Sequence, residues 1–136
     1  DIDSLNGVHI DGKAAPWGGI INLSDSDAQV LSNHQCAYRI TYDIINTGPT
    51  ATNVFSNRLV RGTDTISTTG NLSLGAGQGR NVTVMVYLPP GQHTVGLILD
   101  AGKSVAEINE ANNKKVVHLN VAGPCGGAVE LIERLP

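Results

Sequence analysis

Alternation of apolar and polar residues with a period of two is the main feature of the chain. It is clearest over residues 36–45, where every second side chain is Cys, Tyr or Ile and most of the intervening ones are polar. The same pattern returns over residues 82–88, 95–99 and 116–121. A period of two predicts β-strands that bury one face each, and here it predicts four of them.

Weaker patterns extend this set of strands. The further candidates are residues 54–61, a short edge strand at 65–66, another short piece at 72–74, and one or two N-terminal strands formed by Val8 to Ile10 and by residues 20–23, with a turn at Asp11-Gly12 between them. Residues 128–135 fit neither period clearly. Many short strands separated by Gly-, Pro- and Asn-containing turns predict an all-β, antiparallel sandwich with extra N-terminal strands.

Composition and charge narrow the classes of function. The 136 residues suit one domain, residues 1–136. Only 15% of the residues are charged, the net charge is −3, and no basic block occurs, so no nucleic-acid partner is expected. No apolar run approaches the roughly 18 residues that span a bilayer, so no membrane insertion is expected either.

The chain has two cysteines, Cys36 and Cys125, without the spacing of a zinc site. The favoured interpretation is one disulfide that ties the first core strand to the segment after the last one. Closing so long a loop stabilises a fold by about 4–5 kcal/mol in the chain-entropy model. A disulfide implies an oxidising location, which means secreted, on the cell surface or in the periplasm. Two buried free thiols in a cytosolic protein are the alternative.

The stretch D-A-G-K-S-V-A-E-I-N-E-A-N-N, at 100–113, resembles the closing motif of the CARDB family, the cell adhesion related domain found in bacteria. In that family a strand ending in Asp leads through a loop to V-x-E-x-N-E-x-N-N. The matching positions are Asp100, Val105, Glu107, Asn109, Glu110, Asn112 and Asn113. The Asn46-Thr47-Gly48 segment after the first core strand is similar to the family's N-x-G turn.

The resemblance covers roughly residues 28–122 and leaves an N-terminal extension, 1–27, and a C-terminal tail, 123–136. It implies an immunoglobulin- or fibronectin type III-like sandwich in an exported protein of bacteria or archaea. Such domains are usually modules of larger surface or secreted proteins, and the family name establishes no activity.

The motif is rich in oxygen-bearing side chains. Asp100, Glu107 and Glu110 carry the carboxylates that Ca²⁺ prefers, but no EF-hand spacing is present. Asn and Glu side chains also satisfy backbone groups in long crossover loops, and this structural role is the favoured interpretation. No cofactor is therefore expected, with calcium as the alternative.

Three other features, a tryptophan, an aspartate pair and a histidine, are considered as candidate sites. Trp17 lies among glycines in a predicted loop and is a candidate binding residue, because Trp is common at binding hot spots; the alternative is a Trp that covers the open end of the sandwich. Asp25 and Asp27 form a D-x-D pair, which turn and cap roles explain best. His118 alternates outward in the last strand and is expected to be a solvated edge residue.

None of the sequence patterns of hydrolase or metalloprotease sites occurs, so no catalytic residue and no enzymatic activity are predicted. The predicted function is a non-catalytic extracellular binding or adhesion module for a protein or glycan partner. One alternative is a small secreted inhibitor or regulator of an enzyme. A passive structural spacer in a larger surface protein is another.

Overall fold

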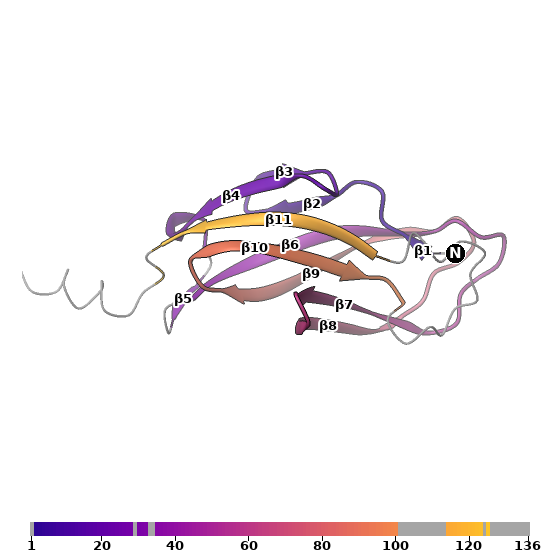
Figure 1. Ribbon diagram of the computed structural model, residues 1–136. Helices are drawn as coiled ribbons and strands as arrows, with labels where there is room; N and C mark the ends of the chain where they lie inside the picture. The colour runs from indigo at the N-terminus through magenta and orange to yellow at the C-terminus, as the bar shows by residue number, and fades with distance from the viewer. Residues whose placement is uncertain (1, 29, 33–34, 101–113, 124, 126–136) are drawn as a thin grey trace, which may run out of the picture.

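A computed structural model describes residues 2–28, 30–32, 35–100, 114–123 and 125. They contain the 3-10 helix η1 (Asp25–Asp27) and the strands β1 (Ile2–Asp3), β2 (Val8–Ile10), β3 (Lys13–Ala15), β4 (Ile20–Ser24), β5 (Val30–Ser32), β6 (Gln35–Asn46), β7 (Phe55–Arg61), β8 (Asp64–Leu72), β9 (Gly79–Leu88), β10 (Gly91–Ile98) and β11 (Lys114–Ala122). Within these ranges no helix is long and apolar enough to cross a membrane. The predicted all-β fold is confirmed (Figure 1).

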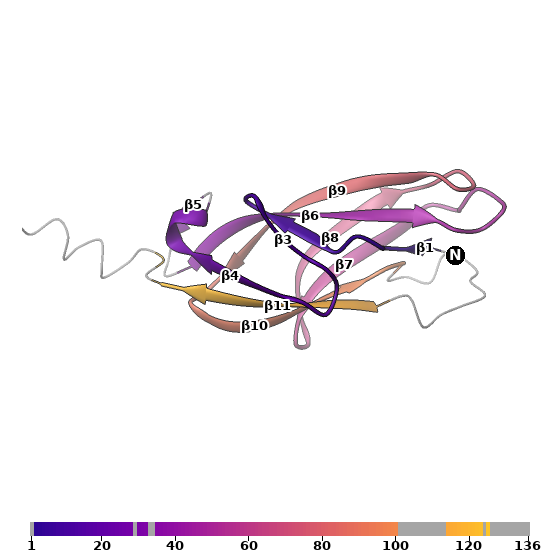
Figure 2. The ribbon, with the colours of Figure 1, turned by 90° about the horizontal axis from the view of Figure 1, so that it is seen from above.

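The strands form two sheets that face each other as a sandwich (Figures 1 and 2). The six-stranded sheet is built on β6, which pairs with β9 along one edge and with β1, β2 and β5 in turn along the other. The five-stranded sheet has the order β4-β11-β10-β7-β8. All pairings are antiparallel except that of β4 with β11, which is parallel.

The central strand β6 has the buried face that its alternation predicts. Its inward side chains are at most 2% exposed; they are Cys36, Tyr38, Ile40, Tyr42 and Ile44. Fully burying an Ile side chain contributes about 1.5–3 kcal/mol, so this one strand anchors the core. The buried phenol of Tyr38 donates to the carbonyl of Ser24 at 2.9 Å, which satisfies its polar end.

The other alternating segments fill the same core. Their buried inward residues are Val82, Val86 and Leu88 in β9, Val95 and Leu97 in β10, and Val117, Leu119 and Val121 in β11. The strand predictions from these segments are confirmed to within a few residues at each end.

The N-terminal region contributes more strands than the sequence indicated. Beyond the two predicted segments, β1 pairs with the end of β6, and β3 follows β2 through a turn in which Asp11 and Gly12 both have positive φ, +47° and +80°. Two successive positive φ values suit the tight two-residue turn of a hairpin. The chain then passes to the other sheet, where β4 joins β11, and returns through β5.

The edge strand predicted at residues 65–66 is present but longer than predicted, and the prediction that His118 lies on an edge is wrong. The pieces predicted at residues 65–66 and 72–74 belong to one region in which a single strand, β8, pairs with β7, and Leu74 lies beyond it. Two register shifts in this pairing hide the alternation in the sequence. His118 is not on an edge, because β4 pairs with β11 on one side and β10 pairs with it on the other.

The predicted disulfide is present. Cys36 in β6 and Cys125, three residues after β11, are bonded across a sequence separation of 89, with their Cα atoms 5.0 Å apart. Both residues are at most 1% exposed. The bond therefore joins the end of the five-stranded sheet to the first core strand of the other sheet.

The N-x-G segment has a clear structural role. Asn46 is buried, and its Nδ2 donates to the carbonyls of Thr50 at 2.7 Å and Gly75 at 3.1 Å. Its Oδ1 accepts from the amide of Gly48 at 2.9 Å. One side chain thus holds two loops together at this end of the sandwich.

Candidate functional site

The outer face of the five-stranded sheet is the best candidate for a contact surface. We call its part over β4, β11 and β10 the β4–β10 face. The pairing registers place Ile20, His118 and Thr94 in one row across these strands. The next row holds Asn22, Asn120 and Gln92. A shallow hollow of about 400 Å³ is lined by Ile20, Gln92, His93, Thr94, His118 and Asn120.

The polar side chains of this face are held in place by one another. Thr94 Oγ1 and His118 Nδ1 lie 3.1 Å apart and share a hydrogen bond. Asn120 Nδ2 donates to Asn22 Oδ1 at 2.9 Å. Because these side chains are already ordered, a partner would lose less conformational entropy when it binds them.

An apolar contribution accompanies the polar rows. Ile20, the first residue of the edge strand β4, has a side chain that is 62% exposed. Two strands away, on β10, Gly96 lies between Val60 and Val116, and a Cβ atom at Gly96 would come within 3.2 Å of Val60 Cγ2. The missing side chain leaves a second hollow of about 110 Å³, which shares Thr94 with the first.

The β4–β10 face combines polar and apolar groups. Its residues offer hydrogen-bond donors and acceptors around an exposed Ile, and the ionised side chain at its rim is Lys114. In the part of the chain that the structure describes, no group of three or more His, Cys, Asp or Glu side chains is placed to hold a metal ion.

Trp17 lies against the sandwich. It is half-buried, packs on the hydrophobic core, and donates from Nε1 to Ser4 Oγ at 3.1 Å. The flanking backbone continues the pairing with β11, because Gly18 donates to the Val116 carbonyl and Gly19 accepts from the His118 amide. This packing accounts for the residue without a ligand, and a binding role for Trp17 stays a prediction.

Asp100 is the described member of the family motif. It is 2% exposed, has a φ of +50°, and its amide donates to Asn57 Oδ1 at 3.0 Å. The remaining motif positions lie outside the described residues; they are Val105, Glu107, Asn109, Glu110, Asn112 and Asn113. The calcium hypothesis for Asp100, Glu107 and Glu110 therefore stays a prediction.

The sequence patterns above did not identify Asn57 as a buried structural residue. It is 1% exposed, and besides accepting from Asp100 it places Nδ2 3.4 Å from the Tyr42 hydroxyl. Burial raises the pKa of Tyr42, while hydrogen bonds from Asn57 and Thr69 act in the opposite direction. The signal was available, since Asn57 occupies an inward position between Phe55 and Leu59. Its role is structural: it joins β6, β7 and the end of β10.

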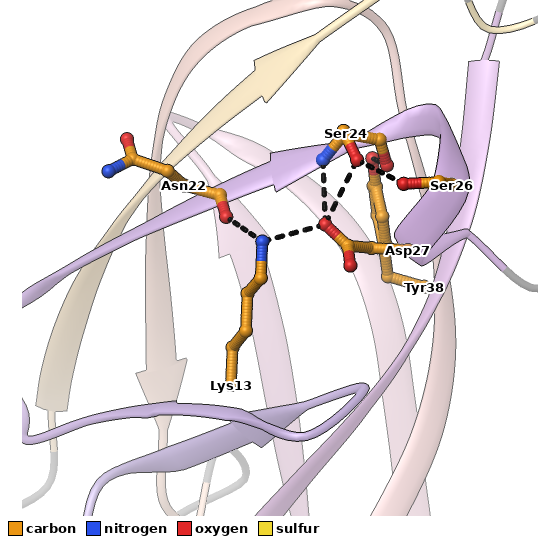
Figure 3. Close-up of polar contacts among 6 residues, drawn as sticks. All are labelled: Lys13, Asn22, Ser24, Ser26, Asp27 and Tyr38. Atoms are coloured by element: carbon orange, nitrogen blue, oxygen red, sulfur yellow. Dashed lines mark hydrogen bonds and ion pairs between the residues drawn. The ribbon is translucent and has the colours of Figure 1, made fainter.

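The D-x-D segment also has a structural role (Figure 3). Asp27 Oδ2 accepts from Lys13 Nζ and from the Ser24 amide, both at 2.9 Å. Hydrogen bonds from Lys13 and Ser24 lower the pKa of Asp27, against the opposing effect of burial. Lys13 Nζ also donates to the carbonyl of Asn22 at 2.8 Å. These contacts fix β3, η1 and the outer edge of β4 to one another, in agreement with the turn and cap role as predicted for Asp27.

Comparisons with known proteins agree with the resemblance seen in the sequence. The family model described as CARDB matches residues 20–117. The CARDB domain of a Pyrococcus furiosus protein, crystallised in complex with di-metal ions, is similar with a TM-score of 0.58 and 18% identity, over 90% of this chain and 88% of that one. A search of curated proteins gave no match.

A second similar structure comes from another archaeon. It is a domain of a candidate cell surface protein from Methanosarcina acetivorans, with a TM-score of 0.62 and 16% identity, over 93% of this chain and 96% of that one. At these identities the two likenesses show a shared fold.

Proposed function

The chain belongs to the CARDB family, and from that premise we propose that it is a non-catalytic extracellular binding module that contacts a protein partner through the β4–β10 face. The observation that carries the proposal is the row of Ile20, His118 and Thr94, in which an exposed apolar side chain adjoins ordered polar ones. This combination of an apolar anchor and fixed hydrogen-bonding groups is typical of protein interfaces.

A protein suits this face better than a glycan does. Sugar rings commonly stack on exposed aromatic side chains, and the residues that line the two hollows of the β4–β10 face include no Trp, Tyr or Phe. Trp17, the candidate binding residue of the sequence, is half-buried and donates its indole N–H to Ser4.

The extracellular location is supported by the disulfide. A disulfide between two cysteines that are at most 1% exposed is typical of proteins that fold in an oxidising compartment. The candidate cell surface protein with the same fold also supports an extracellular location.

The test replaces the apolar anchor of the face. The oxidised domain is immobilised and exposed to envelope and secreted fractions of the source organism, and each captured protein is purified for affinity measurements. Ile20→Glu places a charge within the proposed contact and should weaken binding about tenfold or more. Leu5→Glu is the matched control, since Leu5 is 59% exposed and lies in the segment between β1 and β2 of the other sheet. It should leave the affinity unchanged.

Each contrary outcome overturns a defined part of the proposal. If Ile20→Glu and Leu5→Glu lower the affinity equally, the contact does not lie on the β4–β10 face. If the immobilised domain retains polysaccharide and no protein, the partner is a glycan and not a protein. Stoichiometric suppression of one captured enzyme would make the domain an inhibitor. No retained material at micromolar concentration would favour the passive spacer.

A further inference from the structure

We propose that β9 is a self-association edge, through which two copies of this chain join their six-stranded sheets by antiparallel pairing of β9 with β9. This inference uses a different sheet from the proposed function and is independent of it. An open sheet edge presents unpaired backbone N–H and C=O groups, so it is a template for another strand unless side chains, bulges or charges protect it. The longer edge strands of the described chain are β4, β8 and β9.

The edge of β4 is occupied by side chains (Figure 3). Lys13 Nζ donates to the Asn22 carbonyl, and the Tyr38 hydroxyl donates to the Ser24 carbonyl. The Ser24 amide donates to Asp27 Oδ2. An added strand would have to displace an ion pair and a buried phenol. The cluster therefore acts as a block on this edge.

The edge of β8 is irregular. Its pairing with β7 shifts register twice, between Phe55 and Asn57 and between Leu59 and Val60. Asn71 near its end has a φ of +56°, which turns the backbone out of the extended conformation. Bulges of this kind are a common protection against strand addition.

The edge of β9 has neither protection. Its register with β6 runs without interruption from Gly79 to Leu88. Tyr42 pairs with Val82 on β9 and with Val8 on the opposite side of β6, so the far edge of β9 faces outward from the sheet. Among the described residues β9 pairs with β6 alone, and no side chain of those residues hydrogen-bonds to its backbone.

Apolar groups cluster along this edge. Met85 and Tyr87, on the outer side of β9, are 36% and 48% exposed. Val84 points to the core but is only partly buried, unlike the inward Val82 and Val86. A strand added here would cover Val84 on one face of the sheet and Met85 and Tyr87 on the other. The burial of this apolar surface would stabilise the pairing.

The sequence of β9 is compatible with antiparallel pairing to β9 of a second copy. In the register centred on Val84, Thr83 of each copy lies opposite Met85 of the other, and Asn81 lies opposite Tyr87. Arg80 is the charged residue of β9. In this register it faces Leu88 at the far end of the second strand, so no like charges meet. The contact is a closed two-fold one in which the same patch serves both copies.

Sedimentation of the oxidised protein from micromolar to millimolar concentration tests this proposal. We expect reversible growth from the 14.2 kDa monomer to a dimer, with concentration-dependent protection of β9 amides from hydrogen exchange. Met85→Glu places two carboxylates near the two-fold axis and should weaken the dimer about tenfold or more. Within one copy the new Glu lies opposite Arg39, so the folded monomer should tolerate it.

Thr65→Glu is the matched control, because it adds the same charge at an exposed position of the irregular edge strand β8 and should leave the dimer intact. If Met85→Glu fails to fold, Tyr87→Glu takes its place, since Tyr87 is the more exposed. A monomer at every concentration overturns the proposal. So does a dimer that both β9 variants leave unchanged.

Discussion

Removing the disulfide between Cys36 and Cys125 should destabilise the fold by about 4.6 kcal/mol at 25 °C. The value follows from the sequence separation of 89, because the loss of loop-closure entropy in the unfolded chain grows with the logarithm of loop length. Domains have total stabilities of about 5–15 kcal/mol, so this loss is a third or more of the whole. At about 3–5 °C per kcal/mol, the melting temperature should fall by roughly 14–23 °C.

The perturbation is the double variant Cys36→Ala/Cys125→Ala, measured by urea unfolding and by thermal melting. Both residues are at most 1% exposed, so the Ala pair also leaves a small gap in the core, which adds to the loss. Wild-type protein kept reduced throughout is the control, since it loses the cross-link without losing any atoms. The unfolding slope m should rise in both samples because the unfolded chain becomes more expanded.

The reasoning fails if the reduced protein and the double variant both unfold within about 1 kcal/mol of the oxidised protein. Two thiols that titrate in the native, untreated protein would refute the bond itself. A large loss in the double variant alone would assign the effect to core packing and leave the loop-entropy argument without support.

Two further predictions concern buried and paired polar groups. Asn57→Ala should cost about 1–3 kcal/mol by urea unfolding, because it removes the acceptor of the Asp100 amide in the core; a loss under about 0.5 kcal/mol would contradict this. Asp27→Asn should cost under about 1 kcal/mol, because Lys13 is exposed at the surface. Since the folded pKa of Asp27 is lowered from 3.8, its contribution is present above that pH and is lost as the pH falls through the folded value. Melting curves of wild type and Asp27→Asn should therefore differ at pH 7 and converge in acid, and a difference that grew in acid would contradict the assignment.

The core strands were readable in the sequence because each depends on a local signal. A period of two decides which side chains share a face, and one buried face is enough to identify β6, β9 and β11. The disulfide could be inferred because the chain offers a single possible pair. The motif that begins at Asp100 indicated the family, since its unusual run of Glu and Asn lies at a fixed place before the last strand.

Other features depended on contacts between distant segments. That Asn57 receives the Asp100 amide requires β7 and the end of β10 to be adjacent, and their separation of 43 residues gives no local sign of it. The sequence placed Trp17 in a loop and left open whether it binds a partner or packs on the sandwich. The structure places this loop beside β11 and the indole N–H against Ser4.

Local patterns in the chain predicted the all-β class, the inward face of each long strand, the cross-link and the family. The tertiary structure showed which strands are neighbours and which edges lack a strand partner. β4 lies beside β11 with its outer edge capped by Lys13 and Asp27, and the outer edge of β9 has no strand partner among the described residues. The physical reason is that alternation records the burial of side chains, whereas pairing and edge protection depend on backbone groups whose partners lie far away in the chain.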